Sequence, residues 1–238
     1  MGDSAGGMAM TSQRYATTAG AGSGAMPQQS GAPARELVDG DAPVVRDLRG
    51  RGPLGPRSLD FAPRDVVVVS GLPGSGKSTL IRRAARDHAI DSQDTRDRWE
   101  AAVPGLLPYA LYRPLVRAAH YAGLLRTLRA GGPVVVHDCG TQAWVRRWLA
   151  REARRRGGAL RLVLLDVTPQ LARQGQRERG RGVSGYAFAR HRRAVGRLLR
   201  DTESGLLPPG CSSAVLLDRE TAAAIGLISF PEPRPPQV

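Results

Sequence analysis

Short apolar runs alternate along this chain with longer stretches in which apolar positions recur every three or four residues. Val66 to Val69 is a continuous run of β-branched residues, and Val134 to His137 and Leu160 to Leu165 are similar runs. Such runs are typical of strands buried on both faces of a parallel sheet. The strands expected from the apolar runs are 66–69, 88–90, 134–137, 160–165 and 215–217.

Helical periodicity fills the intervals between these strands. Between Leu111 and Leu128 the apolar residues recur at helical spacing, and Gly131-Gly132 ends the pattern. Thr168 followed by Pro169 is the order of an N-cap and a first helical residue. Strands that alternate with helices in this way predict an α/β protein with a mostly parallel sheet.

The two ends of the chain lack this alternation. The first part contains Gly, Ala, Ser, Thr and Gln without periodicity, as in a disordered tail. After it, Val44-Val45 and Leu59 to Phe61 flank a run rich in Gly and Pro, which fits either a short hairpin or a linker. The expected organisation is a disordered tail at 1–34, a linker or hairpin at 35–64, the ordered domain at 65–228 and a proline-rich tail at 229–238.

The turn after the first buried strand contains a glycine-rich motif. Gly71-Leu72-Pro73-Gly74-Ser75-Gly76-Lys77-Ser78-Thr79 fits the pattern G-x-x-x-x-G-K-[ST] between a strand and a helix. The glycines let the backbone approach a phosphate without a Cβ clash, and the loop N–H groups with the helix N-terminus form a cradle for anionic oxygens. Lys77 is expected to reach the β- and γ-phosphates of a nucleotide and Ser78 to bind its Mg²⁺.

The charge of the chain has two competing explanations. The formal net charge is +14, a surplus that is typical of proteins that bind nucleic acid, anionic lipid or a phosphorylated ligand. However, Lys77 is the only lysine, asparagine is absent, and the abundant Arg, Ala, Gly and Pro have GC-rich codons. Base composition and a polyanionic partner therefore both remain open. The single lysine stands where a compact ammonium suits a phosphate better than a planar guanidinium does.

Composition also narrows the class of protein. The hydrophobic fraction of 41% and the charged fraction of 24% are ordinary for a soluble globular protein. No apolar run approaches the roughly 18 residues that a membrane span needs. Cys139 and Cys211 are too few for a disulfide framework or a zinc site. These features predict a cytoplasmic protein without a membrane partner.

A second strand end offers a carboxylate for the metal. Asp138 directly follows the apolar strand 134–137, and a carboxylate there is typical of a Mg²⁺ site beside a P-loop. The same aspartate also fits the cap of the following helix. Cys139 stands where motor and transporter ATPases usually place a glutamate that activates water. Cysteine in place of this glutamate favours phosphate transfer to a bound acceptor over hydrolysis.

Two further clusters are candidates for the acceptor and for charge neutralisation. Asp91 and Asp94 follow the second strand, where a carboxylate would orient an acceptor hydroxyl and take its proton. The alternative is that they belong to the first turn of a solvated helix. From Arg173 to Gly182, arginines are flanked by glycines, as in a flap that closes over phosphates, and Arg177 is its candidate catalytic residue. A solvated arginine face remains the alternative.

The run SGLPGSGKSTL, the segment DSQDTR, the strand VVVHDCGT and the stretch RQGQRERGR stand in this order. Together they resemble the small P-loop kinases, which include polynucleotide kinases, gluconate kinases, chloramphenicol phosphotransferase and zeta toxins, a group often described as AAA-family ATP-binding domains. The resemblance implies an adenylate-kinase-like P-loop NTPase three-layer sandwich. Its sheet would have five parallel strands in the order 2-3-1-4-5, with an arginine-bearing lid.

The resemblance also implies ATP and Mg²⁺ and carries roles to individual residues. Lys77 and Ser78 would serve phosphate and metal. Asp138 would be the second strand-end carboxylate, and Arg177 and Arg181 would belong to the lid. One position departs from the pattern, because many members carry Asp three residues before the acceptor-segment arginine, where this chain has Gln93.

The sequence therefore predicts an ATP-dependent kinase that moves the γ-phosphate to a hydroxyl of a small molecule or of a polynucleotide end. Gln93 leaves an alternative open, in which the chain is a non-kinase ATP-binding module, either a slow ATPase or a nucleotide sensor. Nucleic-acid binding through arginine, with ATP as a regulator, is a third and weaker interpretation.

Overall fold

The computed structural model describes residues 44–85, 89–90, 109–137, 143–180 and 182–232. The strands are β1 (Val44–Asp47), β2 (Ser58–Asp60), β3 (Val66–Gly71), β4 (Ala89–Ile90), β5 (Val134–His137), β6 (Leu160–Leu165), β7 (Cys211–Leu217) and β8 (Leu227–Ser229). The helices are α1 (Lys77–Ala84), α3 (Tyr109–Arg129), α4 (Ala143–Arg155), α5 (Pro169–Arg177), α6 (Gly185–Glu203) and α7 (Arg219–Ala224), with a 3₁₀ turn at Gly52–Leu54.

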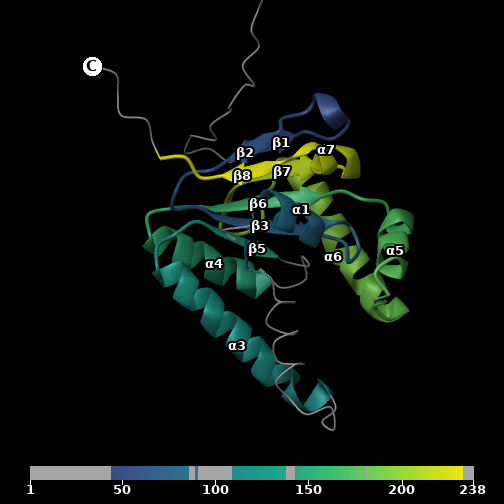
Figure 1. Cartoon of the computed structure of the whole chain (residues 1–238), viewed down its shortest axis with the longest axis horizontal. Coiled ribbons are helices and arrows are strands. Elements are labelled where there is room, and N and C mark those ends of the chain that lie inside the picture. Colours follow the sequence, from purple (N-terminus) through teal and green to yellow (C-terminus); the bar gives the residue numbers. More distant parts are fainter. Residues whose placement is uncertain (1–43, 86–88, 91–108, 138–142, 181, 233–238) are drawn as a thin grey trace, which may run out of the picture. The chain divides into compact units, whose positions relative to one another are not determined.

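A parallel sheet of six strands is the centre of the described chain (Figure 1). Its strand order is β1-β7-β6-β3-β5-β4, and every neighbouring pair is parallel. The five strands expected from the apolar runs thus stand in the order 2-3-1-4-5, and β1 adds a sixth strand beside β7. The predicted α/β P-loop fold class is confirmed, while the predicted number of strands in the sheet is corrected.

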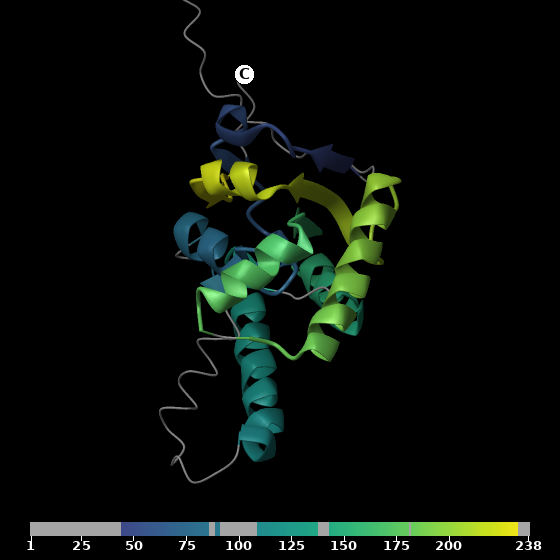
Figure 2. The ribbon, with the colours of Figure 1, turned by 90° about the vertical axis from the view of Figure 1, so that its right-hand side faces the viewer.

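Helices cover both faces of this sheet and complete a three-layer arrangement. Alternate residues of β3 point to opposite faces: Val66 and Val68 pack with α3, α4 and α6, whereas Val67 and Val69 pack with α1 and α7. Figure 2 shows α1 and α7 on one side of the sheet and α6 on the other. Because both faces are covered, the strands are continuous apolar runs rather than alternating ones.

The two strands expected between residues 35 and 64 do form, but they do not pair with each other as in a hairpin. β1 lies parallel to β7, and β2 lies parallel to β8 in a separate two-stranded sheet. Leu48, Leu59 and Phe61 are buried in the cluster that also contains α1 and α7. Burial of these side chains makes this segment part of the folded unit rather than a linker.

Some short elements were not expected from the sequence. α7 has six residues and β8 has three, which is too short for a periodic pattern to be recognisable. β8 ends at Ser229, the first residue of the expected tail, and the ring of Phe230 packs at a tilt against that of Phe61 with 6.1 Å between the centroids. The tail expected at 1–34 lies outside the described residues.

Two helices begin at side-chain caps, of which the one at Thr168 was predicted from the sequence. Thr168 Oγ1 accepts a hydrogen bond from the N–H of Leu171 at 3.4 Å, and Ser184 Oγ accepts one from the N–H of Ala187 at 3.3 Å. α5 follows the carboxyl end of β6, so its start lies at the carboxyl edge of the sheet. Within the described ranges, no helix combines the length and the apolar character that a bilayer crossing requires.

Candidate functional site

The loop from Gly71 to Gly76 joins the carboxyl end of β3 to the first residue of α1. Gly71, Gly74 and Gly76 have positive φ angles of 150°, 86° and 99°. Residues with a Cβ rarely adopt such angles, so the conformation of this loop requires glycine at all three positions. At Gly74 space is also limiting, because a Cβ there would lie 2.0 Å from the carbonyl oxygen of Ala172.

Helix α5 packs directly on this loop. A Cβ on Gly175 would lie 2.5 Å from the carbonyl oxygen of Gly74. Gln176 Nε2 donates a hydrogen bond to the carbonyl oxygen of Pro73 at 2.8 Å, and Gln176 Oε1 accepts one from the N–H of Val183 at 3.3 Å. Gln176 therefore joins the loop to the chain that follows α5. Gln176 lies in the stretch RQGQRERGR, but only the arginines of that stretch were predicted to act at the site.

Three polar side chains of the loop and of the first turn of α1 are buried, whereas Thr79 is exposed. Lys77 is 3% exposed, and its Nζ donates hydrogen bonds to the carbonyl oxygens of Gly71 at 2.9 Å and Leu72 at 2.7 Å. Ser75 and Ser78 are buried beside it. The buried Oγ of Ser75 has no hydrogen-bond partner among the described residues. Because buried hydroxyls are almost always paired, this atom is free to accept or donate a hydrogen bond to a ligand in the loop.

An anion fits this loop on general grounds as well. The first turn of a helix leaves backbone N–H groups without intrahelical partners, and the helix dipole favours negative charge there. α1 begins at Lys77, so these N–H groups, the Lys77 ammonium and the Ser75 hydroxyl converge on one region. The residues present therefore fit the phosphates of a nucleotide.

A cavity of about 250 Å³ opens beside the loop. Its walls come from the loop, from α1, from the end of α5 and from the start of α7. Besides the loop, the residues that line it include Thr79, Leu80, Arg83, Leu165, Val167, Gly175, Glu178, Arg179, Arg219, Ala222 and Ala223. Small and apolar side chains form much of this surface, which suits a planar ring next to bound phosphates.

Of the predicted arginine cluster, Arg179 is the residue that contacts the loop helix. Arg179 Nη2 donates a hydrogen bond to Thr79 Oγ1 at 2.9 Å, and Arg179 lines the cavity. Arg177 instead lines a second cavity of about 310 Å³ together with Arg173, whose guanidinium lies 4.8 Å from the ring centroid of Phe188. Arg181 lies outside the described residues.

The acceptor and metal candidates are not placed by the structure. Asp91, Asp94 and Asp138 all lie outside the described residues. The strand that leads to Asp138 is nevertheless placed, since β5 pairs with β3 and His137 stands opposite Val69. The chain therefore leaves β5 at the carboxyl edge next to the loop. The metal and acceptor roles of these three aspartates remain predictions.

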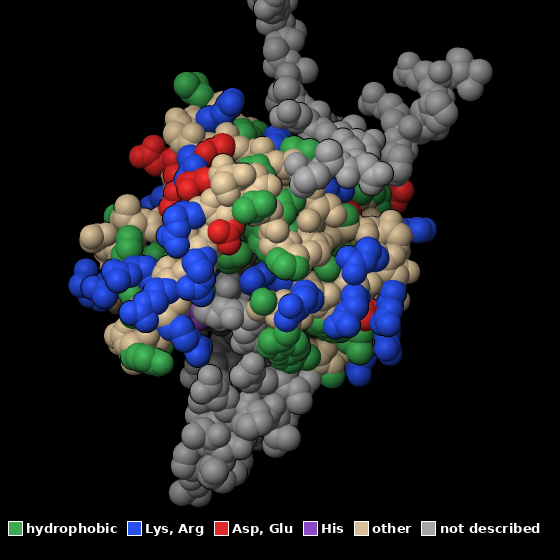
Figure 3. Space-filling model, turned by 180° about the vertical axis from the view of Figure 1, so that it is seen from behind, with side chains coloured by type: hydrophobic (Ala, Val, Ile, Leu, Met, Phe, Trp, Pro, Cys, Tyr) green, Lys and Arg blue, Asp and Glu red, His purple; other side chains and the backbone are tan. Residues whose placement is uncertain are grey.

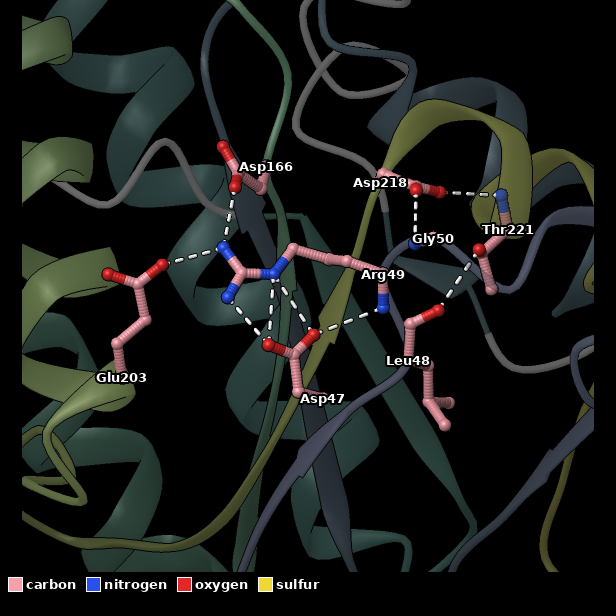
Figure 4. A network of polar contacts seen from close by, with 8 residues as sticks. All are labelled: Asp47, Leu48, Arg49, Gly50, Asp166, Glu203, Asp218 and Thr221. Atoms are coloured by element: carbon pink, nitrogen blue, oxygen red, sulfur yellow. Dashed lines mark hydrogen bonds and ion pairs between the residues drawn. The ribbon is translucent and has the colours of Figure 1, made fainter.

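Asp218 positions the wall that α7 contributes. Its carboxylate caps α7 by accepting a hydrogen bond from the N–H of Thr221 at 2.7 Å and a second one from the N–H of Gly50 at 2.6 Å (Figure 4). Burial works to raise the pKa of Asp218, but these hydrogen bonds outweigh it and lower that pKa below its ordinary value. The carboxylate is thus held ionised at the start of α7.

Comparison with known protein families shows to which family the chain belongs. A family model described as AAA domain matches residues 66–203, which is more than half of the 238 residues. The chain belongs to the AAA domain family. The match includes the glycine-rich loop, α5 and α6, so this AAA domain is an ATP-binding P-loop domain, and the resemblance predicted from the sequence is confirmed at this level. β1 and β7 lie outside the matched residues.

A curated relative of the AAA domain is the aliphatic sulfonates import ATP-binding protein SsuB of Cupriavidus necator. The two are 31% identical over 119 residues, which covers 45% of this chain and 39% of that protein. The chain therefore spans well under half of the length of this relative.

Similar solved structures belong to several kinds of protein. A gluconokinase from Sinorhizobium meliloti is 21% identical with a TM-score of 0.39, covering 68% of this chain and 92% of its own. A Deinococcus radiodurans tunicamycin resistance protein is 16% identical with a TM-score of 0.37, covering 62% and 99%. A chain of the Streptococcus pneumoniae PezAT toxin-antitoxin system is 18% identical with a TM-score of 0.42, covering 50% and 52%. The family assignment rests on the match of residues 66–203.

Proposed function

We propose that this AAA domain is a kinase that transfers the γ-phosphate of ATP to a hydroxyl group of a small molecule or of a polynucleotide end. The observation that supports it most is the P-loop itself, in which Lys77 is buried and Ser75, whose hydroxyl has no partner among the described residues, lines a cavity. The phosphates would occupy the loop, and the cavity would receive the adenine ring and ribose.

The residues of the loop would bind the phosphates in a defined way. The Lys77 ammonium would exchange its contacts with the carbonyl oxygens of Gly71 and Leu72 for contacts with the β- and γ-phosphates. The Ser75 hydroxyl would gain the partner that it lacks. Ser78 and Asp138 would hold Mg²⁺, which when bound neutralises phosphate charge. Thr79 and Arg179 would close one side of the nucleotide site.

Transfer would then depend on residues that flank the loop. Asp91 or Asp94 would accept the proton of the acceptor hydroxyl, whose oxygen forms the new bond to the γ-phosphorus as the bond to the β-γ bridging oxygen breaks. Arginines of the lid, Arg177 and Arg181 among them, would neutralise the charge that develops during transfer. Cys139 after Asp138 favours transfer, because a water-activating glutamate is absent at that position.

Replacement of Lys77 tests the site. Lys77→Ala is expected to lower ATP-dependent turnover by about 100- to 1,000-fold, because one preorganised donor to the phosphates is lost. Turnover is measured as ADP release, and ATP affinity by calorimetry. Arg126→Ala, which removes an exposed arginine of α3, is the matched control and should leave both unchanged. Unaltered turnover in Lys77→Ala, with both variants folded, would contradict the site assignment.

A second candidate is a non-kinase ATP-binding module, either a slow ATPase or a nucleotide sensor. Gln93, in place of the aspartate that the resemblance implies, favours it. A panel of hydroxyl compounds and of oligonucleotides with free hydroxyl ends separates the two. If the protein is a kinase, one class of acceptor should raise the rate of ADP release and become phosphorylated. If it is a non-kinase module, no acceptor should change the rate of ADP release.

A further inference from the structure

Two walls of the cavity beside the P-loop belong to the segments that follow β6 and β7. Leu165, the last residue of β6, and Val167 after it line the cavity, and Arg219 lines it at the start of α7. Both segments contact the turn that follows β1. We call residues 47–52 the β1 turn. This turn lies outside residues 66–203, so it is a feature of this chain beyond the AAA domain match.

Arg49 connects the β1 turn to the first of these walls (Figure 4). Its Nη1 donates to Asp166 Oδ2 at 2.7 Å and to Glu203 Oε1 at 2.6 Å, while Nη2 donates to Asp47 Oδ2 at 2.6 Å. Asp166 stands between the two cavity residues Leu165 and Val167. One guanidinium therefore joins the ends of β1 and α6 to the segment that forms the cavity wall.

The backbone of the same turn connects to the second wall. The N–H of Gly50 donates to Asp218 Oδ2 at 2.6 Å, and the N–H of Gly52 donates to Thr221 Oγ1 at 3.0 Å. Thr221 Oγ1 in turn donates to the carbonyl oxygen of Leu48 at 3.1 Å. These contacts determine where α7 begins, and therefore where Arg219 enters the cavity wall.

The two ends of α7 are held by different parts of the chain. Near its C-terminus, Arg83 of α1 donates to the carbonyl oxygens of Ala222 at 2.5 Å and Ile225 at 3.0 Å. At its N-terminus, the contacts come from the β1 turn. Loss of the β1 turn contacts would leave α7 attached to α1 at one end while its start could shift. None of these hydrogen bonds from the β1 turn involves a residue of the P-loop.

The exposure of the Arg49 network indicates a local role. The side chains of Arg49, Asp166 and Glu203 are 25%, 36% and 41% exposed. Ion pairs with this exposure contribute little to the global free energy of unfolding. A planar guanidinium with three carboxylate partners is well suited to fix their relative positions.

We propose that Arg49 is a positioning residue for the base and ribose of the nucleotide, acting through Asp166 and through the β1 turn on the two cavity walls. The proposal rests on the proposed function, since it assigns the cavity to the nucleoside part of ATP. It concerns the fit of the base and not the binding of the phosphates, which belongs to the P-loop. ATP and inorganic tripolyphosphate therefore report on different parts of the site.

Arg49→Met tests the proposal, with Arg155→Met as the matched control. Arg155 also forms an ion pair, with Glu152 at 2.7 Å on α4, and its side chain is 71% exposed. For Arg49→Met we expect the Kd of ATP and the KM for ATP to rise about tenfold with kcat little changed, because binding common to ground and transition states is lost. The affinity for tripolyphosphate, measured by calorimetry, should not change. Arg155→Met should leave all of these values unchanged.

Asp166→Asn provides a second variant if Arg49→Met does not fold. It keeps the size of the side chain, removes its charge, and should give the same split between ATP and tripolyphosphate. Equal losses of ATP and tripolyphosphate affinity, or no loss of either in the folded variants, would overturn the positioning role. Failure of the proposed function is detected in the wild-type protein instead. It would show as no binding of ATP, or as tripolyphosphate binding that is no weaker than ATP binding. In either case the positioning proposal fails as well.

Discussion

At the scale of residues, the glycines of the P-loop are required for two different reasons. Gly76 has a φ of 99°, but a Cβ there would meet nothing within 4 Å. Gly74 combines a φ of 86° with the close approach of Ala172. The first requirement is local and follows from the motif. The second arises only because α5 packs on the loop.

Gly175 and Gly123 give a matched pair of helix substitutions. Alanine is favoured over glycine in a helix by about 1 kcal/mol, so Gly123→Ala in α3, where nothing lies within 4 Å, should stabilise the protein by up to that amount. Gly175→Ala should instead destabilise it by about 1–3 kcal/mol and weaken ATP binding, because its Cβ would lie 2.5 Å from the carbonyl oxygen of Gly74. Urea unfolding and calorimetry measure both effects. If Gly175→Ala instead stabilised the protein, α5 would not be in close contact with the loop at this position.

At the scale of elements, one buried ion pair joins the starts of β3 and β6. Asp65 accepts hydrogen bonds from Arg161 Nε at 2.8 Å, from the N–H of Ala159 at 2.8 Å and from the N–H of Ala62 at 3.1 Å. The Asp65 side chain is 2% exposed and that of Arg161 is 10% exposed. The pair lies at the edge of the sheet opposite to the P-loop, so it affects folding rather than the site.

Asp65→Ala is expected to lower the free energy of unfolding by about 3–5 kcal/mol, because it leaves the Arg161 guanidinium buried without its carboxylate. The exposed pair of Arg155 with Glu152 is the control, and Arg155→Ala should change the same quantity by at most about 1 kcal/mol. Urea denaturation of both variants measures the difference. Similar losses of unfolding free energy in the two variants would contradict the prediction that the buried ion pair contributes more to stability than the exposed one.

At the scale of the whole molecule, the net charge of +14 does not point to one binding surface. Exposed arginines lie on α4 and on α6, and Figure 3 shows Lys and Arg side chains on both sides of the face seen from behind. Most Asp and Glu side chains visible on that face lie together at its upper left. A wide distribution of arginine agrees with the base-composition explanation of the charge.

The carboxylates around the β1 turn predict how stability depends on pH. The hydrogen bond from Arg49 holds the pKa of the exposed Asp47 below its ordinary value, and the pKa of Asp218 is also lowered. A carboxyl group with a lowered pKa stabilises the fold above its unfolded pKa, and this contribution is lost as the pH falls through the folded value. The free energy of unfolding should therefore fall below about pH 4, and only by a small amount because these carboxylates are partly exposed.

Urea unfolding between pH 7 and pH 3 measures this dependence. Arg49→Met should make it shallower than in the wild type, because the pKa of Asp47 then returns toward its ordinary value. Arg155→Met, which removes an ion pair of α4, controls for the loss of one positive charge. Identical pH profiles for the wild type and Arg49→Met would contradict the prediction.

The sequence by itself determined the features that depend on neighbouring residues. The buried strands are continuous apolar runs, Thr168 and Ser184 cap the helices that follow them, and the P-loop motif lies between a strand and a helix. These patterns are local, since capping and φ preferences involve residues a few positions apart. They were sufficient for the fold class, the central strand order implied by the resemblance, and the ATP-binding loop.

Only the tertiary structure decided which distant segments meet. It paired β1 with β7 and β2 with β8, and it placed Arg179 rather than Arg177 against Thr79, 100 residues earlier in the chain. It also brought Arg49 to Asp166 across 117 residues. No short-range pattern encodes such contacts, because they depend on which surfaces are buried together when the layers pack.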